Sequence, residues 1–194
     1  EGVWSTYLGR ELTKVDGGFA LRMAPAYTDG LLDLVGLAHC KNVALPSGDV
    51  SGSVEDDSEK LGPLIHACYR TAVGSLLWCS MCRYDIVFAV KECAMHVHSP
   101  SQLDRANLKR ICRYLAGARG SYVVIRPGTL DASMVWPRCS VTAFSDASWA
   151  PGQGYRSTSG GVLCVNGAVL ANWARTQSTS SQSSCEAELI ALPM

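Results

Sequence analysis

The sequence predicts an α+β fold: an N-terminal β-hairpin with helices, a central helical region, and a C-terminal antiparallel sheet with one helix. Three observations lead to this prediction. Apolar residues recur with the period of a helix between positions 63 and 120, and with the period of a strand from Tyr122 onward. The pair Asn166-Gly167 separates two short apolar runs, which is typical of a hairpin. The 194 residues, 47% hydrophobic and 18% charged, suffice for a buried core.

The first elements expected are a hairpin and a helix. Trp4–Thr13 alternates loosely and Phe19–Met23 follows the turn Asp16-Gly17-Gly18, so the two segments are expected to pair. Pro25 suits the first turn of a helix, because its missing N–H has no intrahelical partner there. Gly36 should end that helix.

An acidic linker is expected next, at positions 47–62. Its sequence SGDVSGSVEDDSEK holds five acids and one lysine among glycine and serine, which is typical of a solvated connection. Three helices should follow, and the third is expected to open with Ser99 as N-cap and Pro100 in its first turn. Their predicted ranges are Leu64–Cys82, Asp85–Val97 and Ser99–Gly117.

The C-terminal part should consist of short strands and a last helix. The Asn166-Gly167 hairpin is the strongest of these signals, because both central residues of a type I′ turn need positive φ. The helix should begin near Ser183, where Ser183-x-x-Glu186 reads as a capping box in which the Glu186 carboxylate reaches back to the N-cap amide. The predicted strands are Tyr122–Ile125, Val141–Asp146, Gly161–Val165 and Ala168–Trp173.

Charge and cysteine content narrow the classes of partner. Lysine plus arginine and aspartate plus glutamate number 17 each, so no overall field draws the chain to nucleic acid or to a membrane surface. No apolar run approaches the ~18 residues of a spanning helix, and no membrane partner is expected. The nine cysteines are odd in number and lie mostly in apolar segments, which favours buried thiols in an intracellular, cytoplasmic or nuclear, compartment.

One basic stripe is a candidate for nucleic-acid binding. Arg105, Lys109 and Arg113 recur at i, i+4 and i+8 and therefore share a helix face. Two interpretations remain open: an ordinary solvated face, or a surface that neutralises phosphates and binds in a salt-dependent way. The opposing apolar face consists of Leu108, Ile111, Cys112 and Leu115.

A zinc site is an alternative for the central region. Cys79-x-x-Cys82 has Cys93, His96 and His98 downstream, and four ligands of this kind hold tetrahedral zinc. The cysteine pair is expected on a buried helix rather than on the tight turn of a zinc knuckle, which favours small buried hydrophobic side chains.

Two carboxylates are candidates for a Mg²⁺ site. Asp146 is expected at the end of a strand and Glu188 in the first turns of the helix that follows the hairpin. Mg²⁺ prefers such oxygen ligands, although two carboxylates alone are a weak signal. Glu186 competes with Glu188, but its expected capping role favours Glu188 as the ligand.

Two series of short motifs follow one another along nearly the whole chain. The earlier motifs are YLGREL from Tyr7, CKNVA from Cys40, YRTAVGSLLW from Tyr69, RYDIVFAV from Arg83 and KRICRYLAG from Lys109. The C-terminal motifs are FSDASWA from Phe144, RSTSGG from Arg156, Asn172-Trp173, Gln177 and SCEAELIAL from Ser184. With these motifs the chain resembles the polyproteins of copia-type (Ty1/copia) retrotransposons. The C-terminal motifs are similar to the N-terminal half of their ribonuclease H domain, and the earlier ones to the region that follows the reverse-transcriptase palm.

The resemblance implies a parent that performs RNA-directed DNA synthesis and cleaves RNA in an RNA–DNA hybrid with two Mg²⁺ ions held by four carboxylates. Asp146 and Glu188 match two of these carboxylates, as catalytic and metal-binding residues. The other two carboxylates and the palm motif are expected outside the chain, so the chain is expected to lack catalysis. Arg175 and Gln177 become weaker candidates for contacting a hybrid strand. Tyr84 replaces the family's usual proline, so a helix is expected to continue through Arg83–Asp85.

The resemblance also implies a domain division and partners. Residues 1–46 would end the palm or start a thumb-like region, 47–62 form the linker, 63–120 a helical thumb or connection, and 121–194 a truncated ribonuclease H-like domain. The expected partners are an RNA–DNA hybrid or a template–primer duplex and the remainder of the polyprotein. The competing hypothesis is a non-catalytic helical module that binds nucleic acid or zinc.

Overall fold

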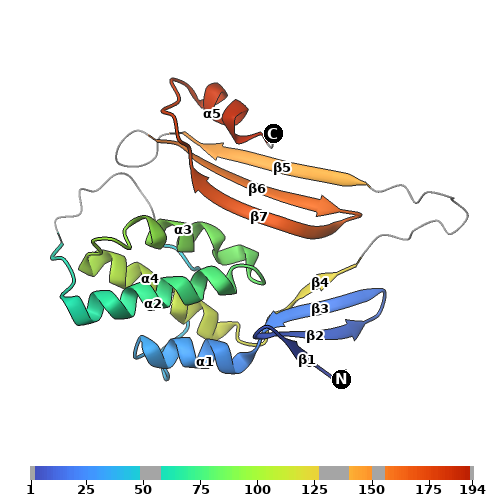
Figure 1. Ribbon diagram of the computed structural model, residues 1–194, viewed down its shortest axis with the longest axis horizontal. Helices are drawn as coiled ribbons and strands as arrows, with labels where there is room; N and C mark the ends of the chain where they lie inside the picture. The colour runs from blue at the N-terminus through green and yellow to red at the C-terminus, as the bar shows by residue number, and fades with distance from the viewer. Residues whose placement is uncertain (1–2, 49–57, 127–139, 150–155, 193–194) are drawn as a thin grey trace, which may run out of the picture. The chain divides into compact units, whose positions relative to one another are not determined.

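The structure is a computed structural model that describes residues 3–48, 58–126, 140–149 and 156–192. It confirms the α+β class and contains two compact units: residues 6–11 with 22–123, and residues 1–5 with 12–21 and 124–194 (Figure 1). The strands are β1 Ser5–Tyr7, β2 Arg10–Val15, β3 Gly18–Met23, β4 Val123–Ile125, β5 Val141–Ser148, β6 Thr158–Val165 and β7 Ala168–Thr176. The helices are α1 Pro25–Leu34, α2 Pro63–Cys79, the 3₁₀ helix η1 Tyr84–Ile86, α3 Val87–Met95, α4 Gln102–Gly117 and α5 Ser184–Ala191.

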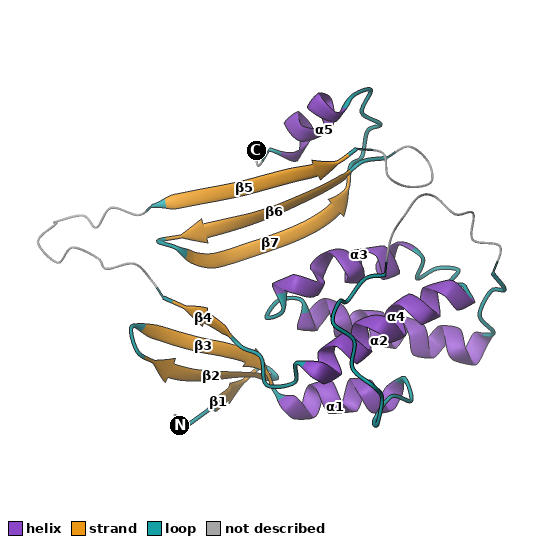
Figure 2. Ribbon diagram, turned by 180° about the vertical axis from the view of Figure 1, so that it is seen from behind, coloured by secondary structure: helices purple, strands orange, loops and turns teal. Residues whose placement is uncertain are grey.

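The N-terminal hairpin is present and belongs to a four-stranded sheet of order β1-β2-β3-β4 (Figure 2). Gly17, in the predicted turn, has φ +69°, as the hairpin requires. A second turn at Leu8 and Gly9, both with positive φ, divides the first predicted segment into β1 and β2. β4 joins the sheet beside β3, where a Cβ on Gly18 would lie 2.1 Å from the Ile125 carbonyl oxygen. Glycine at position 18 therefore permits this long-range pairing.

The first two helices begin at prolines, whose fixed φ suits the first helical position. Helix α1 starts at Pro25 as predicted and ends before Gly36, which has φ +71°. Helix α2 starts at Pro63 and ends at Cys79, earlier than the predicted Cys82. The core of the helical unit includes the fully buried Leu32, Leu76, Ile86, Leu108 and Ile111.

The prediction that a helix continues through Arg83–Asp85 is wrong. Arg83 has φ −126° and ψ 79°, and the chain turns there before the 3₁₀ helix. The Arg83 guanidinium donates to both Asp85 carboxylate oxygens, at 3.0 and 2.7 Å, and to the Ala118 carbonyl oxygen at 3.2 Å. The Tyr114 hydroxyl also donates to Asp85, at 2.6 Å. These contacts with the end of α4 stabilise the turn at Arg83, although Tyr84 stands where the family usually has a proline.

The Asp85 network predicts a pH-dependent part of the stability. Burial raises the pKa of Asp85, but hydrogen bonds from Arg83 and Tyr114 outweigh it and hold that pKa below its usual value. We expect Asp85→Asn to lower the free energy of unfolding by about 1–2 kcal/mol at pH 7, because the bonds from Arg83 and Tyr114 lose their charged acceptor. Solvent screening of the partly exposed carboxylate keeps the loss within this range. The contribution is present above the unfolded pKa of about 3.9 and is lost as the pH falls through the lower folded value.

Urea denaturation of both proteins between pH 7 and pH 3 measures this effect. The matched control is Asp29→Asn, which removes a surface ion pair with Arg119, and should cost no more than about 0.5 kcal/mol. A difference between wild type and Asp85→Asn that persists undiminished at pH 3 would contradict the prediction.

Helix α4 is capped by Ser101, and the predicted N-cap Ser99 is wrong. The Ser101 hydroxyl accepts from the Asp104 backbone N–H at 3.2 Å, and the Asp104 carboxylate accepts from the Ser101 N–H at 2.8 Å. This reciprocal capping box satisfies two N-terminal donors. The described end of the predicted linker lies against this cap, since Leu61 N–H donates to the Pro100 carbonyl and Gln102 N–H to the Glu59 carbonyl.

The C-terminal sheet has the order β5-β6-β7, with both pairs antiparallel. Asn166 and Gly167 have φ +48° and +80°, so the predicted turn between β6 and β7 is confirmed. The predicted strands at 141–146, 161–165 and 168–173 are present, and each extends further than predicted. Gly161 makes room for the indole of Trp173, because a Cβ there would lie 2.1 Å from a ring carbon.

Candidate functional sites

Asp146 lies within β5, which continues past it to Ser148. Its cross-strand partner in β6 is Gly160, and the side chain of Asp146 is exposed. A partner without a side chain leaves the carboxylate open to solvent and to any ion. The sequence therefore placed Asp146 on the correct strand, although not at its end.

Helix α5 presents Glu188 to solvent. Ala187 and Ala191, one turn apart, are buried at 0% and 4% exposure and form the inner side of the helix. Ser183 is the N-cap as predicted, and its hydroxyl accepts from the Glu186 N–H at 3.2 Å. The Glu186 carboxylate accepts from the N–H of Gln182, one residue before the predicted partner, at 2.7 Å. Glu186 is thus engaged at the cap, while Glu188 has no hydrogen bond or ion pair to any described residue.

Gln177 joins the sheet to α5. Its amide nitrogen donates to the Ser159 hydroxyl at 2.9 Å and to the Ala187 carbonyl at 2.8 Å, and its amide oxygen accepts from the Ser181 hydroxyl at 2.8 Å. Gln177 is 4% exposed. Its amide is therefore used inside the protein, in contrast to the expected contact with a hybrid strand.

The register relates Asp146 to α5. Ser159, which Gln177 connects to α5, pairs with Ala147 and shares its face of the sheet. Asp146 therefore lies on the opposite face, since successive residues of a strand point to opposite sides. Helix α5 lies along the β5 side of the sheet in both ribbon views (Figures 1 and 2). To bind one ion together, the side chains of Asp146 and Glu188 would have to meet around the edge of the sheet that β5 forms.

The carboxylates have the right chemistry for Mg²⁺ but do not form a complete site. Within residues 3–48, 58–126, 140–149 and 156–192, no three His, Cys, Asp or Glu side chains gather in a metal-binding arrangement. Two exposed carboxylates cannot impose the octahedral geometry that Mg²⁺ demands. By themselves, Asp146 and Glu188 therefore support no catalytic step.

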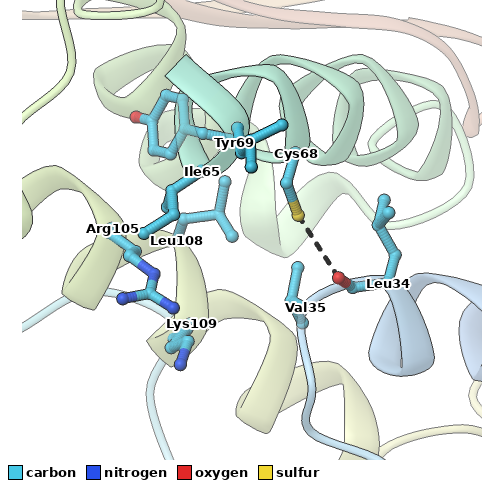
Figure 3. A pocket seen from close by; sticks show the side chains of 9 residues that line it. Leu34, Val35, Ile65, Cys68, Tyr69, Arg105, Leu108 and Lys109 are labelled. Carbon is cyan, nitrogen blue, oxygen red and sulfur yellow. Dashed lines mark hydrogen bonds between the residues drawn. The ribbon is translucent and has the colours of Figure 1, made fainter. Parts of the chain in front are cut away.

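The basic stripe on α4 is half-buried rather than freely solvated. The Arg113 guanidinium donates to the Lys41 backbone carbonyl at 2.8 Å, which ties α4 to the segment after α1. Arg105 and Lys109 line a groove beside α1 and α2 (Figure 3). Arg175, the remaining candidate, is exposed on β7, with its guanidinium 5.8 Å from the centre of the Trp173 ring.

The cysteines of the zinc alternative are buried thiols. Burial raises the pKa of Cys79 and of Cys93 to about 12, and it also raises that of Cys82. Every cysteine that the structure describes is free, while Cys139 lies outside those residues. His96 contacts Asp104, 2.6 Å from Nδ1 to the carboxylate. The described side chains thus favour core packing over zinc binding in this region.

The comparison with known proteins gives relatives from Arabidopsis thaliana. The chain is 30% identical over 183 residues to the retrovirus-related Pol polyprotein from transposon RE2, and the match covers 94% of the chain and 12% of that protein. It is 33% identical over 121 residues to the polyprotein from transposon RE1, covering 62% of the chain and 8% of the relative. The chain is similar to a segment of retrotransposon Pol polyproteins. These matches confirm the predicted resemblance to retrotransposon polyproteins.

The chain spans only a small part of the Pol polyproteins that it matches. It is also 27% identical over 189 residues to the uncharacterized mitochondrial protein AtMg00810, covering 97% of the chain and 74% of that protein. No family model and no solved structure matches the chain.

None of the helices that the structure describes combines the length and apolar composition needed to cross a bilayer.

Proposed function

We propose that the chain corresponds to the part of a copia-type Pol polyprotein that runs from the end of the reverse transcriptase into the first half of the ribonuclease H domain. The observation that carries this proposal is the match of 94% of the chain to the RE2 polyprotein. The element order supports it, because a helical region is followed by an antiparallel sheet and then by α5. The proposed boundaries are 1–46, 47–62, 63–120 and 121–194.

In this proposal the parent performs RNA-directed DNA synthesis and cleaves the RNA of a hybrid. Asp146 and Glu188 would be two of the carboxylates that hold Mg²⁺ in the complete domain, and the bound metal would supply Lewis-acid assistance to cleavage of the RNA strand. The chain itself binds a hybrid or template–primer duplex without cleaving it. Arg105 and Lys109 are the main phosphate contacts, because Arg113 already donates to the Lys41 carbonyl. Arg175, which is exposed, is a further contact.

A salt titration of binding tests the proposed nucleic-acid contact. We expect a fluorescein-labelled RNA–DNA hybrid to bind in a salt-dependent way, and Lys109→Gln to reduce the slope of log K against log salt by about 1. Lys14→Gln, on the exposed side of β2, removes the same charge elsewhere and should leave the slope unchanged. Equal slopes for wild type and Lys109→Gln, or an equal loss in the Lys14 control, would refute the contact.

A cleavage assay with the same hybrid and Mg²⁺ tests the proposed lack of catalysis. We expect the RNA strand to remain intact, because no three His, Cys, Asp or Glu side chains of the described residues gather in a metal-binding arrangement. Cleavage that Asp146→Asn abolishes would show that the chain is an enzyme and that this part of the proposal is wrong.

A further inference from the structure

The helical unit has a groove of about 200 Å³ between the end of α1, the start of α2 and the middle of α4. Figure 3 shows Val35 and Cys68 facing one another across it, with Arg105 and Lys109 together on the α4 side. The Cys68 thiol donates to the Leu34 carbonyl at 3.2 Å. The nine lining residues are Leu34, Val35, Leu64, Ile65, Cys68, Tyr69, Arg105, Leu108 and Lys109.

The groove has an apolar floor and an exposed apolar rim. Tyr69 and Leu108 are each 2% exposed and form part of the floor, whereas Leu64 at the rim is 88% exposed. Leu34 and Ile65 are also exposed, at 41% and 37%. Exposed apolar side chains gathered around a depression are typical of an interaction surface.

Two cations complete this surface. Arg105 and Lys109 lie one turn apart on α4, and neither forms an ion pair with a carboxylate of the described residues. Their charges therefore complement an acidic ligand that also has an apolar part. The volume is below the ~300 Å³ typical of small-molecule sites and suits one or two side chains of a larger partner.

We infer that this groove binds an acidic amphipathic helix of a protein partner. Apolar side chains of that helix cover Leu64 and Ile65 and enter the groove, while its carboxylates pair with Arg105 and Lys109. This is the helix-in-groove mode, in which anchors one turn apart fill the depression. A phosphate backbone would use the two cations but leave the apolar rim in water. The one aromatic lining residue, Tyr69, is buried and offers no stacking surface to a base. The inference goes beyond the proposed function. The hybrid contact proposed above uses the same two cations, so the helix and the hybrid are expected to compete for Arg105 and Lys109.

Fluorescence anisotropy with designed peptides tests this inference on the full chain. The probe is a fluorescein-labelled helical peptide of about 15 residues, with leucines one turn apart and glutamates beside them. A matched peptide carries lysine at each glutamate position. We expect the acidic peptide to bind at least about tenfold more tightly than the basic one. Lys109→Glu should weaken the acidic peptide about tenfold and strengthen the basic peptide, because the charge pattern is exchanged.

Leu64→Ser separates the apolar contribution from the charge. Because Leu64 is 88% exposed, its replacement should leave the fold intact and weaken the acidic peptide about fivefold. Leu77→Ser is the control, since Leu77 is 48% exposed on the same helix but does not line the groove. Equal binding of both peptides, or an unchanged affinity in Leu64→Ser, would overturn the inference. So would a labelled RNA–DNA hybrid that loses affinity in Leu64→Ser as the acidic peptide does, because the groove would then be a nucleic-acid site.

Discussion

Replacing Leu76 with alanine is expected to lower the free energy of unfolding of the helical unit by about 3 kcal/mol. Leu76 is 0% exposed on α2, which contacts both α3 and α4. Truncation removes transfer free energy and leaves a cavity that rigid neighbouring helices fill only in part. Urea denaturation followed by far-UV circular dichroism measures the loss.

The next residue along α2 provides the control. Leu77 is 48% exposed, so Leu77→Ala removes the same atoms from a site that keeps much of its contact with water. We expect this variant to lose less than about 1 kcal/mol. Equal losses at the two positions would mean that α2 does not present Leu76 to the core.

Gln177→Ala is expected to destabilise the C-terminal unit by about 3 kcal/mol. The variant removes three buried hydrogen bonds, those to the Ser159 hydroxyl, the Ser181 hydroxyl and the Ala187 carbonyl. Among the described residues, the Ser181 hydroxyl keeps only the 3.5 Å bond that it accepts from Ser157. Each unsatisfied buried group costs about 1–3 kcal/mol, although relaxation and water entry offset part of the sum. Hydrogen exchange of the α5 amides is the direct measurement, because it reports opening of this helix.

Gln182→Ala is the matched control for this prediction. The Gln182 side chain is exposed, and its backbone N–H keeps the bond to the Glu186 carboxylate after the change. We expect a change of no more than about 0.5 kcal/mol. If α5 exchanges at the wild-type rate in Gln177→Ala, the amide does not hold the helix to the sheet. Contact of Gln177 with a nucleic acid would then be worth testing again.

Several elements were predictable from short stretches of sequence because their signals are local. The Asn166-Gly167 turn has positive φ at both residues, Pro25 begins α1, and Ser183 caps α5, as expected. In each case the side chain or ring acts on its own backbone or on residues within one turn. The Ser101 cap was missed although its signal was present, since Asp104 three residues later completes a capping box.

The candidate sites were only partly predictable. The sequence correctly predicts that Arg105, Lys109 and Arg113 share one face of a helix. It does not predict that Arg105 and Lys109 line a groove beside α1, or that Arg113 donates to the Lys41 carbonyl. Gln177 was expected to face a ligand and is instead 4% exposed. Nothing in the residues around it distinguishes a buried amide from an exposed one.

Local backbone preference and the spacing of apolar residues were enough to establish the α+β class, most of the elements and the motifs that relate the chain to Pol polyproteins. Only the folded chain shows that β4 pairs with β3 and that the chain turns at Arg83. Only the folded chain shows, too, that Asp146 and α5 lie on opposite faces of the sheet. The physical reason is that these features depend on contacts between residues that are far apart in the sequence. Hydrogen bonds between residues distant in sequence, such as Arg83 to Ala118, form only after packing has brought their partners together.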